Sequence, residues 1–585
     1  MNIDTIVVVA YFLFLIAIGW MFRKFTTSTS DYFRGGGKML WWMVGATAFM
    51  TQFSAWTFTG AAGRAFSDGF VVVILFLANA FGYLCNYLYF APKFRQLRVV
   101  TAIDAIRMRF GKTSEQFFTW AGLPDSMISS GIWLNGLAIF VAAVFDIPME
   151  VTIVVTGLVL MLMAVTGGSW AVVASDFMQM LVIMAVTITC AIAAYFYGGG
   201  VGNIISNFEG DFFVGNNLNY MSIFILWVVF IFIKQFGVMN NSINAYRFLC
   251  AKDSENARKA AGLACALMVI GPMIWFLPAW YIAAFMPDFA ASYDVGADAA
   301  YLAFVEHLMP AGMVGLLMSA MFAATMSSMD SGLNRNAGIF VINFYNPILR
   351  PNATQKELMV VSKLTTVLMS FLIIGIGLFI NSLRDLSLFD IVLNVGALIG
   401  FPMLIPVLLG MWIRNTPDWA AWATLIVGGI VSFIFGISLD AHHVESFFGL
   451  EQALTAREWA DLKVTLSLAA HVVFTGGFFV AIGIAYKGRT CRTAEREAEV
   501  KQLFINWNTP VVADSEDQND LDTKQRSMLG NLICVAGFGI LAMALIPNEP
   551  TGRVLFLLCG SIVLTVGIFL VSAAKKGDTK VLAEQ

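Results

Sequence analysis

Central to this chain is the sequence Gly315-Leu-Leu-Met-Ser-Ala-Met-Phe-Ala-Ala-Thr-Met-Ser-Ser-Met-Asp-Ser-Gly-Leu-Asn334. It is apolar enough to cross a bilayer, yet it carries several hydroxyls and a carboxylate. At helical spacing, one narrow face of this segment carries Ala324, Ser327, Ser328 and Ser331. Asp330 lies beside that face. The segment is therefore predicted to be a membrane-spanning helix with an unusual polar stripe.

Two interpretations of the stripe remain open. Hydroxyl, carbonyl and carboxylate oxygens are the ligands that a hard cation such as sodium requires. Small residues also let two membrane helices pack closely, without any ligand. Asp330 favours the first interpretation, because a carboxylate inside a membrane costs about 3 kcal/mol or more and usually marks a transport pathway.

Composition identifies the class of protein. Of 585 residues, 59% are hydrophobic and 12% are charged, whereas a soluble domain carries about 25% charged residues. The chain is thus predicted to be an all-α integral membrane protein embedded in the lipid bilayer, with no nucleic-acid partner. No nucleophile–base pair or metal-ligand spacing is visible, so we do not expect an enzyme.

Spans of about 20 apolar residues predict about fifteen membrane helices. They comprise a lead helix, a core bundle and two additional C-terminal helices. Most of the 35 basic residues fall in cytoplasmic segments if the N-terminus is outside and the C-terminus is cytoplasmic. We expect a multi-pass protein of the inner or plasma membrane. The predicted parts are a transmembrane domain over 1–487, a charged cytoplasmic linker over 488–527, and two helices with a short tail over 528–585.

Two predicted helices contain polar interruptions. Numbered from the segment that begins at Leu40, the first core helix carries Thr51-Gln-Phe-Ser54. The sixth core helix carries Lys234-Gln-Phe-Gly237 and Asn240-Asn-Ser242. Unwound backbone is tolerated in a membrane where it is buried in protein or lines a cavity. Broken helices at matching positions of two halves indicate the midplane site of a transporter. The halves are predicted over about 40–199 and 220–414.

Five ordered motifs resemble those of the sodium:solute symporter family, over roughly residues 1–487. They are Asp31-Tyr-Phe-Arg-Gly-Gly-Gly-Lys-Met-Leu-Trp-Trp42, Thr51-Gln-Phe-Ser-Ala-Trp-Thr-Phe58, Gly167-Gly-Ser-Trp-Ala-Val-Val-Ala-Ser-Asp176, Tyr246-Arg-Phe-Leu-Cys-Ala-Lys-Asp253, and Leu308-Met-Pro-Ala-Gly-Met-Val-Gly315 leading to Ser327-Ser328. The resemblance implies the inverted-repeat bundle of the leucine-transporter type, with five plus five helices, and sodium-driven uptake of a solute.

The resemblance also implies two sodium sites. The main one falls on the backbone carbonyls of Met50, Phe53 and Ala324 and the hydroxyls of Ser327 and Ser328. A second sodium, present in some members, would be held by Asp176 with Ser327, Ser331 and Asp330. Sugar-transporting members carry a small neutral residue at the position of Asp330. Asp330 therefore either strengthens the second sodium site or carries a proton.

Substrate residues follow from the same resemblance. The expected set is Ser54, Thr57, Phe76, Asn79, Lys234 and Gln235, and it lacks most of the polar pattern of a hexose site. Lys234 replaces a neutral amide, and a midplane lysine needs an anionic partner. That partner is either a carboxylate of the substrate or one of Asp330 and Asp176. We favour the substrate.

The sequence thus predicts a sodium-coupled symporter that imports a small carboxylate-bearing solute by alternating access. A sialic acid, an amino acid and an organic acid all fit this class. The alternatives are a sodium/sugar symporter, a transporter-like membrane sensor and a passive channel. We expect a monomer or a loose oligomer.

Overall fold

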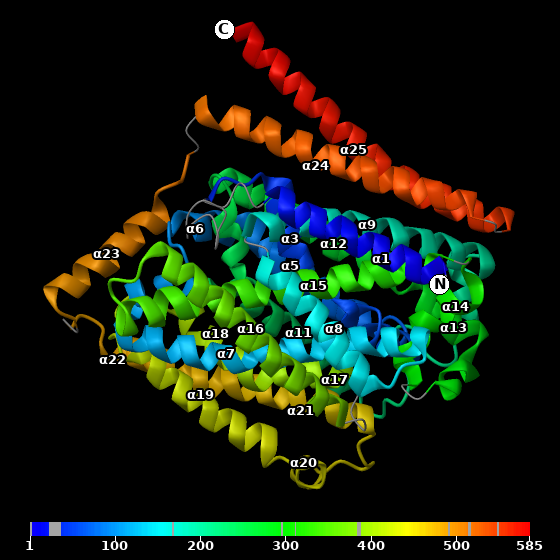
Figure 1. The fold of residues 1–585 in the computed structure, drawn as a ribbon. Coiled ribbons are helices and arrows are strands. Elements are labelled where there is room, and N and C mark those ends of the chain that lie inside the picture. Colours follow the sequence, from blue (N-terminus) through cyan, green and yellow to red (C-terminus); the bar gives the residue numbers. More distant parts are fainter. Residues whose placement is uncertain are drawn as a thin grey trace.

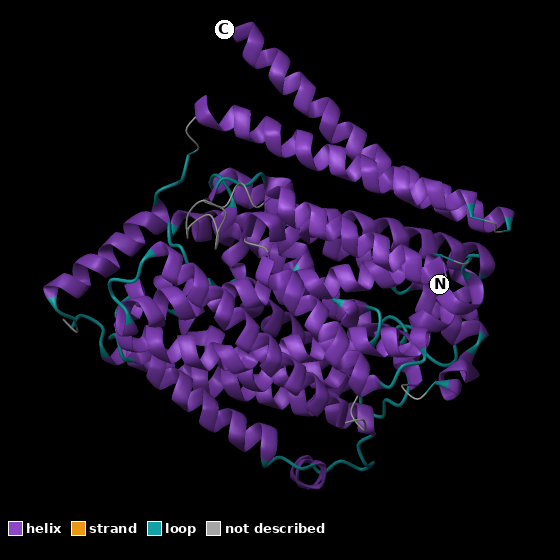
Figure 2. Cartoon of the chain, viewed as in Figure 1, coloured by secondary structure: helices purple, strands orange, loops and turns teal. Residues whose placement is uncertain are grey.

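The computed structural model describes residues 3–22, 37–166, 169–293, 296–310, 312–382, 388–489, 492–512, 516–546 and 549–584. These residues are helical nearly throughout and contain no β-strand (Figure 2). The predicted motif at 31–42 lies partly outside them, as do Gly167 and Gly168. The all-α prediction is confirmed for the described part of the chain.

Most helices run roughly side by side in one bundle, as Figure 1 shows. The N-terminal third of the chain contains α1 (Ile3–Phe22), α3 (Trp41–Met50), α4 (Gly60–Asp68), α5 (Val71–Cys85), α6 (Ala91–Gln96), α7 (Ala102–Phe145), α8 (Met149–Thr166), α9 (Ser169–Tyr197) and α10 (Val201–Asn207). Next come α11 (Met221–Met239), α12 (Ser254–Trp275), α13 (Leu277–Phe285), α14 (Ala300–Leu308), α15 (Met313–Ile339), α16 (Gln355–Ser382), α17 (Leu388–Val395) and α18 (Phe401–Leu409). The remaining helices are α19 (Ala420–Ile437), α20 (Ala441–Phe448), α21 (Ala456–Ala470), α22 (Gly477–Ala485), α23 (Ala494–Asn508), α24 (Glu516–Ala542) and α25 (Pro550–Glu584).

Among the described residues, 11 helices are long and apolar enough to cross a membrane, or 12 if the bent pair α19–α20 is one span. The predicted count of about fifteen is therefore not established. It included α1 and α8, whose apolar parts are shorter, and the first core helix, which is divided between α3 and α4. Short or broken helices lack a continuous apolar stretch that is long enough to cross a membrane.

α15, which contains the sequence quoted first, is the most enclosed of these spans, with 94% of its most apolar stretch buried. The lead helix α1 packs along it. Asp4 Oδ1 accepts hydrogen bonds from Gly312 N at 3.1 Å and Gly315 N at 2.7 Å, so a carboxylate caps the start of α15. The polar stripe therefore belongs to a central helix that is held at its first turn.

The first predicted helix break is confirmed. α3 ends at Met50, and a short 3₁₀ turn (Ala55–Thr57) precedes α4. In the sixth core helix, α11 continues through Lys234-Gln-Phe-Gly237 to Met239 and breaks only afterwards. The predicted interruption at Lys234–Gly237 is therefore wrong, whereas the one at Asn240–Ser242 is confirmed.

The C-terminal segments form two separate features. α23 lies at the left edge of the bundle in Figure 1, inside the segment predicted as a linker. α24 and α25 pack against each other, and α25 also contacts α9. A Cβ at Gly537 would lie 2.8 Å from Leu564 N, so glycine permits the close approach of these two helices.

Candidate functional site

The first group of polar atoms lies where α3 breaks. Ser328 Oγ on α15 donates to Phe53 O at 2.8 Å and Met50 O at 3.1 Å. Ala324 lies one turn earlier on α15 and is fully buried. Thr325 Oγ1 accepts from Ala55 N at 3.1 Å. The structure thus brings together the hydroxyl and two carbonyls that the sequence assigned to the main sodium site.

A second group surrounds Asp176 of α9. Its Oδ2 accepts a hydrogen bond from Thr47. The carboxylate also contacts the Ser327 hydroxyl, and it interacts electrostatically with Asp330 and Arg247. Asp330 Oδ1 is buried and has no hydrogen-bond partner among the described residues. The side chain of Ser331 lies outside what the structure describes.

Arg247 was not identified from the sequence as part of this group. Its side chain is 1% exposed, and it follows the break after α11 in a 3₁₀ turn (Asn244–Cys250). Two carboxylates and one guanidinium leave a net negative charge, which requires a cation or a proton in a buried environment. The only sequence signal was a charged residue in the turn Tyr246–Asp253.

A cavity of about 250 Å³ adjoins the broken helix. Its wall includes five of the six predicted substrate residues: Ser54, Phe76, Asn79, Lys234 and Gln235. Thr57 does not line it, although its hydroxyl is buried without a hydrogen-bond partner among the described residues. Ser328 is also part of the wall. The candidate solute cavity therefore adjoins the first group of polar atoms, where Ser328 meets the break after α3.

Lys234 enters the cavity wall from α11. Its Nζ donates to Leu393 O at 3.4 Å, and its side chain is almost fully buried. A Cβ at Gly396 would lie 2.9 Å from Nζ, so a glycine there leaves room for the lysine. Among the described residues, the ammonium thus makes one long hydrogen bond, and it borders an open volume.

Two further charged residues line the cavity that were not predicted as site residues. Asp125 of α7 interacts electrostatically with Lys234 and Arg335, and it makes no ion pair or hydrogen bond among the described residues. Arg335 Nη2 donates to Ser126 Oγ at 3.2 Å. The carboxylate near Lys234 is therefore Asp125, and not Asp330 or Asp176 as the alternative interpretation held.

One end of the cavity is covered by two layers. Trp56, on the wall, donates through Nε1 to Leu388 O at 3.2 Å and stacks on Phe389 with ring centroids 5.8 Å apart. The Arg64 guanidinium lies 5.4 Å from the Phe389 ring centre. Beyond this aromatic layer lies a buried cluster of ion pairs.

The ion-pair cluster joins α4 to α21. Arg64 contacts Asp68 at 2.8 Å and Asp461 at 3.4 Å, and Arg457 contacts the same carboxylates at 3.3 and 3.7 Å. Arg457 also donates to Asn216 O and Val214 O, each at 2.6 Å. These contacts fix α4 and α21 relative to each other beyond the aromatic layer. Two of the pairs, Arg64–Asp68 and Arg457–Asp461, lie four residues apart on one helix. The other two join α4 to α21 across the sequence, so no local motif indicated the cluster as a whole.

Comparison with known proteins supports the same class. The sodium:solute symporter family model matches residues 32–428. The chain is 27% identical over 473 residues to a sodium/glucose cotransporter of Vibrio parahaemolyticus, covering 75% of this chain and 85% of the relative. It is 27% identical over 473 residues to sodium/myo-inositol cotransporter 2 of Sus scrofa, covering 74% and 69%. It is 25% identical over 452 residues to the osmoregulated proline transporter of Bacillus subtilis (strain 168), covering 74% and 89%.

A solved structure shares the fold. The chain resembles a Na⁺-coupled sialic acid symporter in a substrate-bound outward-open state, with a TM-score of 0.65, 19% sequence identity, and coverage of 84% of this chain and 99% of that one. The family and these relatives are transporters and not enzymes.

Proposed function

Because this chain belongs to the sodium:solute symporter family, in which sodium-coupled transport of small solutes across a membrane is the common activity, we propose that it imports a carboxylate-bearing solute. The observation that carries the proposal is the position of Lys234 on the cavity wall, beside an open volume and with a single long hydrogen bond to the residues that the structure describes. A bound carboxylate would complete its coordination through a charge-assisted hydrogen bond worth about 1.5–3 kcal/mol.

The charges around the cavity support an anionic or zwitterionic solute. Lys234 and Arg335 contribute two positive charges and Asp125 one negative charge. The cavity therefore carries a net positive charge that a carboxylate would neutralise. Asp125 would at the same time tolerate an ammonium group on the solute, so sialic acids, amino acids and small organic acids remain within the class.

Sodium would couple solute binding to closure through the broken helix. In the structure the Ser328 hydroxyl directs its hydrogen at the Met50 and Phe53 carbonyls. A sodium ion among these oxygens, Ala324 O and Ser327 Oγ would let the hydroxyl rotate and offer a lone pair instead. The ion would then hold α3 and α15 together, and its departure would free them.

We assign a second sodium to Asp176 and Asp330, with Ser327 and Ser331 as further ligands. The unpartnered oxygen Asp330 Oδ1 and the net negative charge of the group support the assignment. Moving sodium with an anionic solute also offsets the charge carried across the membrane. Arg247 would act here as a fixed counter-charge that keeps the two carboxylates close together.

The expected architecture and orientation complete the proposal. Two repeats, over about 40–199 and 220–414, would open the cavity in turn to each side of the membrane. They would lie within a transporter domain over 1–487. Residues 488–527 and 528–585 would be accessory. The N-terminus would be outside and the C-terminus in the cytoplasm. The protein would lie in the inner or plasma membrane as a monomer or loose oligomer.

The test is concentrative uptake by the full chain in proteoliposomes. An inward sodium gradient should drive accumulation of at least one radiolabelled solute from a panel of sialic acids, amino acids, organic acids and hexoses. Equal uptake with a choline gradient would contradict sodium coupling. Equilibration without accumulation would indicate a channel.

The alternative is a sodium/sugar symporter. The glucose and myo-inositol relatives and the neutral amides of Asn79 and Gln235 on the cavity wall favour it. Accumulation of a hexose but of no carboxylate-bearing solute in the same panel would establish this alternative. Absence of any accumulated solute, with sodium binding intact, would instead favour a transporter-like sensor.

A further inference from the structure

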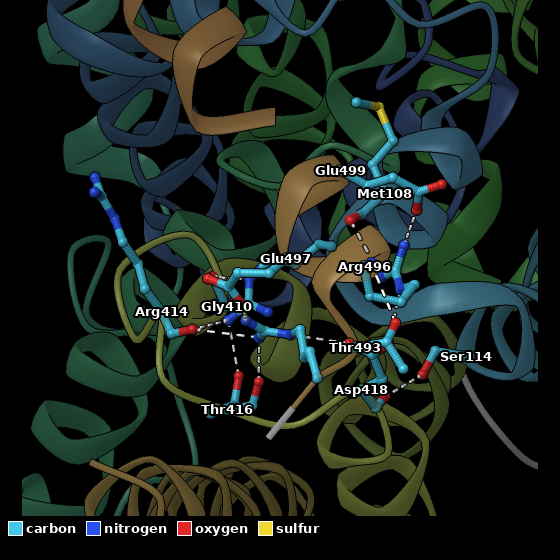
Figure 3. A network of polar contacts seen from close by, with 12 residues as sticks. Met108, Ser114, Gly410, Arg414, Thr416, Asp418, Thr493, Arg496, Glu497 and Glu499 are labelled. Carbon is cyan, nitrogen blue, oxygen red and sulfur yellow. Dashed lines mark hydrogen bonds and ion pairs between the residues drawn. The ribbon is translucent and has the colours of Figure 1, made fainter. Parts of the chain in front are cut away.

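A network of arginines and one aspartate anchors α23 to the bundle (Figure 3). Asp418 accepts from Arg492 Nε at 3.1 Å and from Arg496 Nε at 2.9 Å. Ser114 Oγ of α7 donates to the backbone carbonyl of Asp418 at 2.9 Å. The start of α23 is therefore tied to α7 and to the loop between α18 and α19.

The apolar side of α23 is buried on the same surface. Its contact residues are Val500, Leu503, Phe504 and Trp507. Trp507 packs edge-to-face on Phe94, with ring centroids 5.9 Å apart. Polar anchoring and apolar burial together make α23 a fixed part of the described structure and not a solvated tether.

A hollow of about 890 Å³ lies between α23 and the loop that follows α18. Its charged lining residues are Arg414, Arg489, Arg492, Lys501 and Glu497. Glu497 is already engaged by Arg492 at 3.2 Å, and Arg492 also has Asp418 as a partner. We call this hollow the basic groove.

Within the described part of the chain, the other three cations of the basic groove have no carboxylate partner. Arg414, Arg489 and Lys501 make no ion pair among the described residues. The Arg414 guanidinium lies 4.3 Å from the Phe504 ring centre, and in Figure 3 it points away from the dashed network. Stacking on an aromatic ring orients a guanidinium while leaving its N–H groups able to bind an anion.

The groove lies at the level where membrane spans end. α18 is followed by Trp412, α19 is preceded by Trp419, and α22 is followed by Tyr486. Trp412 and Trp419 are 48% and 37% exposed, and Trp419 contacts Tyr486 with ring centroids 6.1 Å apart. Exposed aromatic residues at span ends mark the headgroup region of a bilayer. Ile505, which is half-exposed on the groove wall, offers an apolar contact beside the cations.

We propose that the basic groove binds the phosphate group of an anionic phospholipid, with Arg414, Arg489 and Lys501 as the anion-binding side chains. Arginine binds phosphate oxygens through paired N–H groups, and lysine adds a point charge. Basic pockets beside membrane helices bind anionic headgroups in this way. The bound lipid would connect α23 to the membrane and stabilise the docked helix.

The test is a thermal-denaturation assay of the full chain in detergent, with added phosphatidylglycerol, phosphatidylcholine or inorganic phosphate. A ligand of the folded state raises the melting temperature by mass action. Phosphatidylglycerol should stabilise the protein, whereas phosphatidylcholine should not. The double variant Arg489→Gln, Lys501→Gln should bind phosphatidylglycerol about tenfold more weakly or worse. Both side chains are exposed, so the variant should fold.

The matched control is Arg258→Gln, Lys356→Gln, which removes two exposed basic residues elsewhere. It should keep the full response to phosphatidylglycerol. An equal loss of response in both double variants would overturn the site, because it would indicate general charge attraction. Equal stabilisation by inorganic phosphate and phosphatidylglycerol would overturn the assignment to a lipid. An unchanged response of the groove variant would overturn the proposal as a whole.

Discussion

The Ser328 hydroxyl lies 2.8 Å from the carbonyl oxygen of Phe53, so a side chain of α15 closes directly on the broken turn after α3. This contact couples two helices that are far apart in the sequence. It is also the contact that a sodium ion at this position would replace. Its energetic role can therefore be tested by sodium titration, without knowledge of the solute.

Ser328→Ala should raise the sodium concentration needed for half-maximal stabilisation roughly fivefold or more, because a lost ligand costs about 1 kcal/mol or more. The measurement is the melting temperature of the full chain in sodium chloride against choline chloride. Ser319→Ala is the matched control, since that buried hydroxyl of α15 donates to Gly315 O of its own helix at 2.8 Å. Wild-type sodium dependence in Ser328→Ala would remove the main site from α15.

Asp330→Asn should remove one of two sodium ions and lower the Hill coefficient of sodium-dependent stabilisation from about two to about one. The reason is that Asp176 alone would then balance Arg247, which leaves no net negative charge in the group. Asp125→Asn, which alters the cavity charges instead, should keep the higher coefficient. If Asp330 carries a proton, the variant will keep its Hill coefficient and lose pH dependence of transport.

The break after α3 was predictable because polar residues interrupt an apolar run at Thr51-Gln-Phe-Ser54. The same reasoning misplaced the break in α11. A lysine and a glutamine leave the backbone hydrogen bonds of a helix intact, so Lys234 and Gln235 remain helical. The helix ends where Asn241 Oδ1 accepts from Ile243 N at 2.9 Å and Asn244 N at 3.1 Å, because such side-chain bonds compete with the helical ones.

The charged members of the site were less predictable than its hydroxyls. Ser327 and Ser328 lie on one helical face that periodicity reveals. By contrast, Asp125, Arg335 and Arg247 acquire their roles through neighbours on other helices. No local pattern in the sequence indicates that these residues are buried or which residues they contact. The alternative interpretation of Lys234, a structural pair with Asp330 or Asp176, overlooked Asp125 for this reason.

Lys234→Met should weaken binding of the transported carboxylate-bearing solute by about tenfold or more, because it removes a charge-assisted hydrogen bond in a buried cavity. Direct binding of a sialic acid, an amino acid and a dicarboxylic acid, with sodium present, provides the measurement. Lys363→Met, at an exposed position of α16, is the control. Tight sodium-dependent binding of a neutral hexose, equal in Lys234→Met and wild type, contradicts the assigned role.

Asp461→Asn should destabilise the covered end of the cavity, because Arg64 and Arg457 share this buried carboxylate. Breaking a buried ion pair costs about 3–5 kcal/mol, so the melting temperature should fall by several degrees. Arg350→Gln disrupts an exposed pair with Glu357 and should have little effect. Similar losses in both variants would show that burial of the cluster adds nothing.

Asp298 should make stability depend on pH near neutrality. It lies in a short turn (Gly296–Ala299) outside the spans, and a Cβ at Gly63 of α4 would lie 2.4 Å from its Oδ1. Burial, and secondarily the charge of Asp390, raise the pKa of the Asp298 carboxyl to about 7. The folded state thus favours the protonated form, whereas an unfolded aspartate has a pKa of about 3.9.

This stabilisation is fully present below about pH 4. It is lost as pH rises through about 7. Asp298→Asn imitates the neutral acid, so the variant should lose less stability than wild type between pH 5 and pH 8. Melting temperatures across that range provide the measurement. Asp288→Asn, at an exposed position before the same turn, should follow the wild-type profile. If Asp298→Asn also follows that profile, the Asp298 carboxyl is ionised in the folded protein throughout the range.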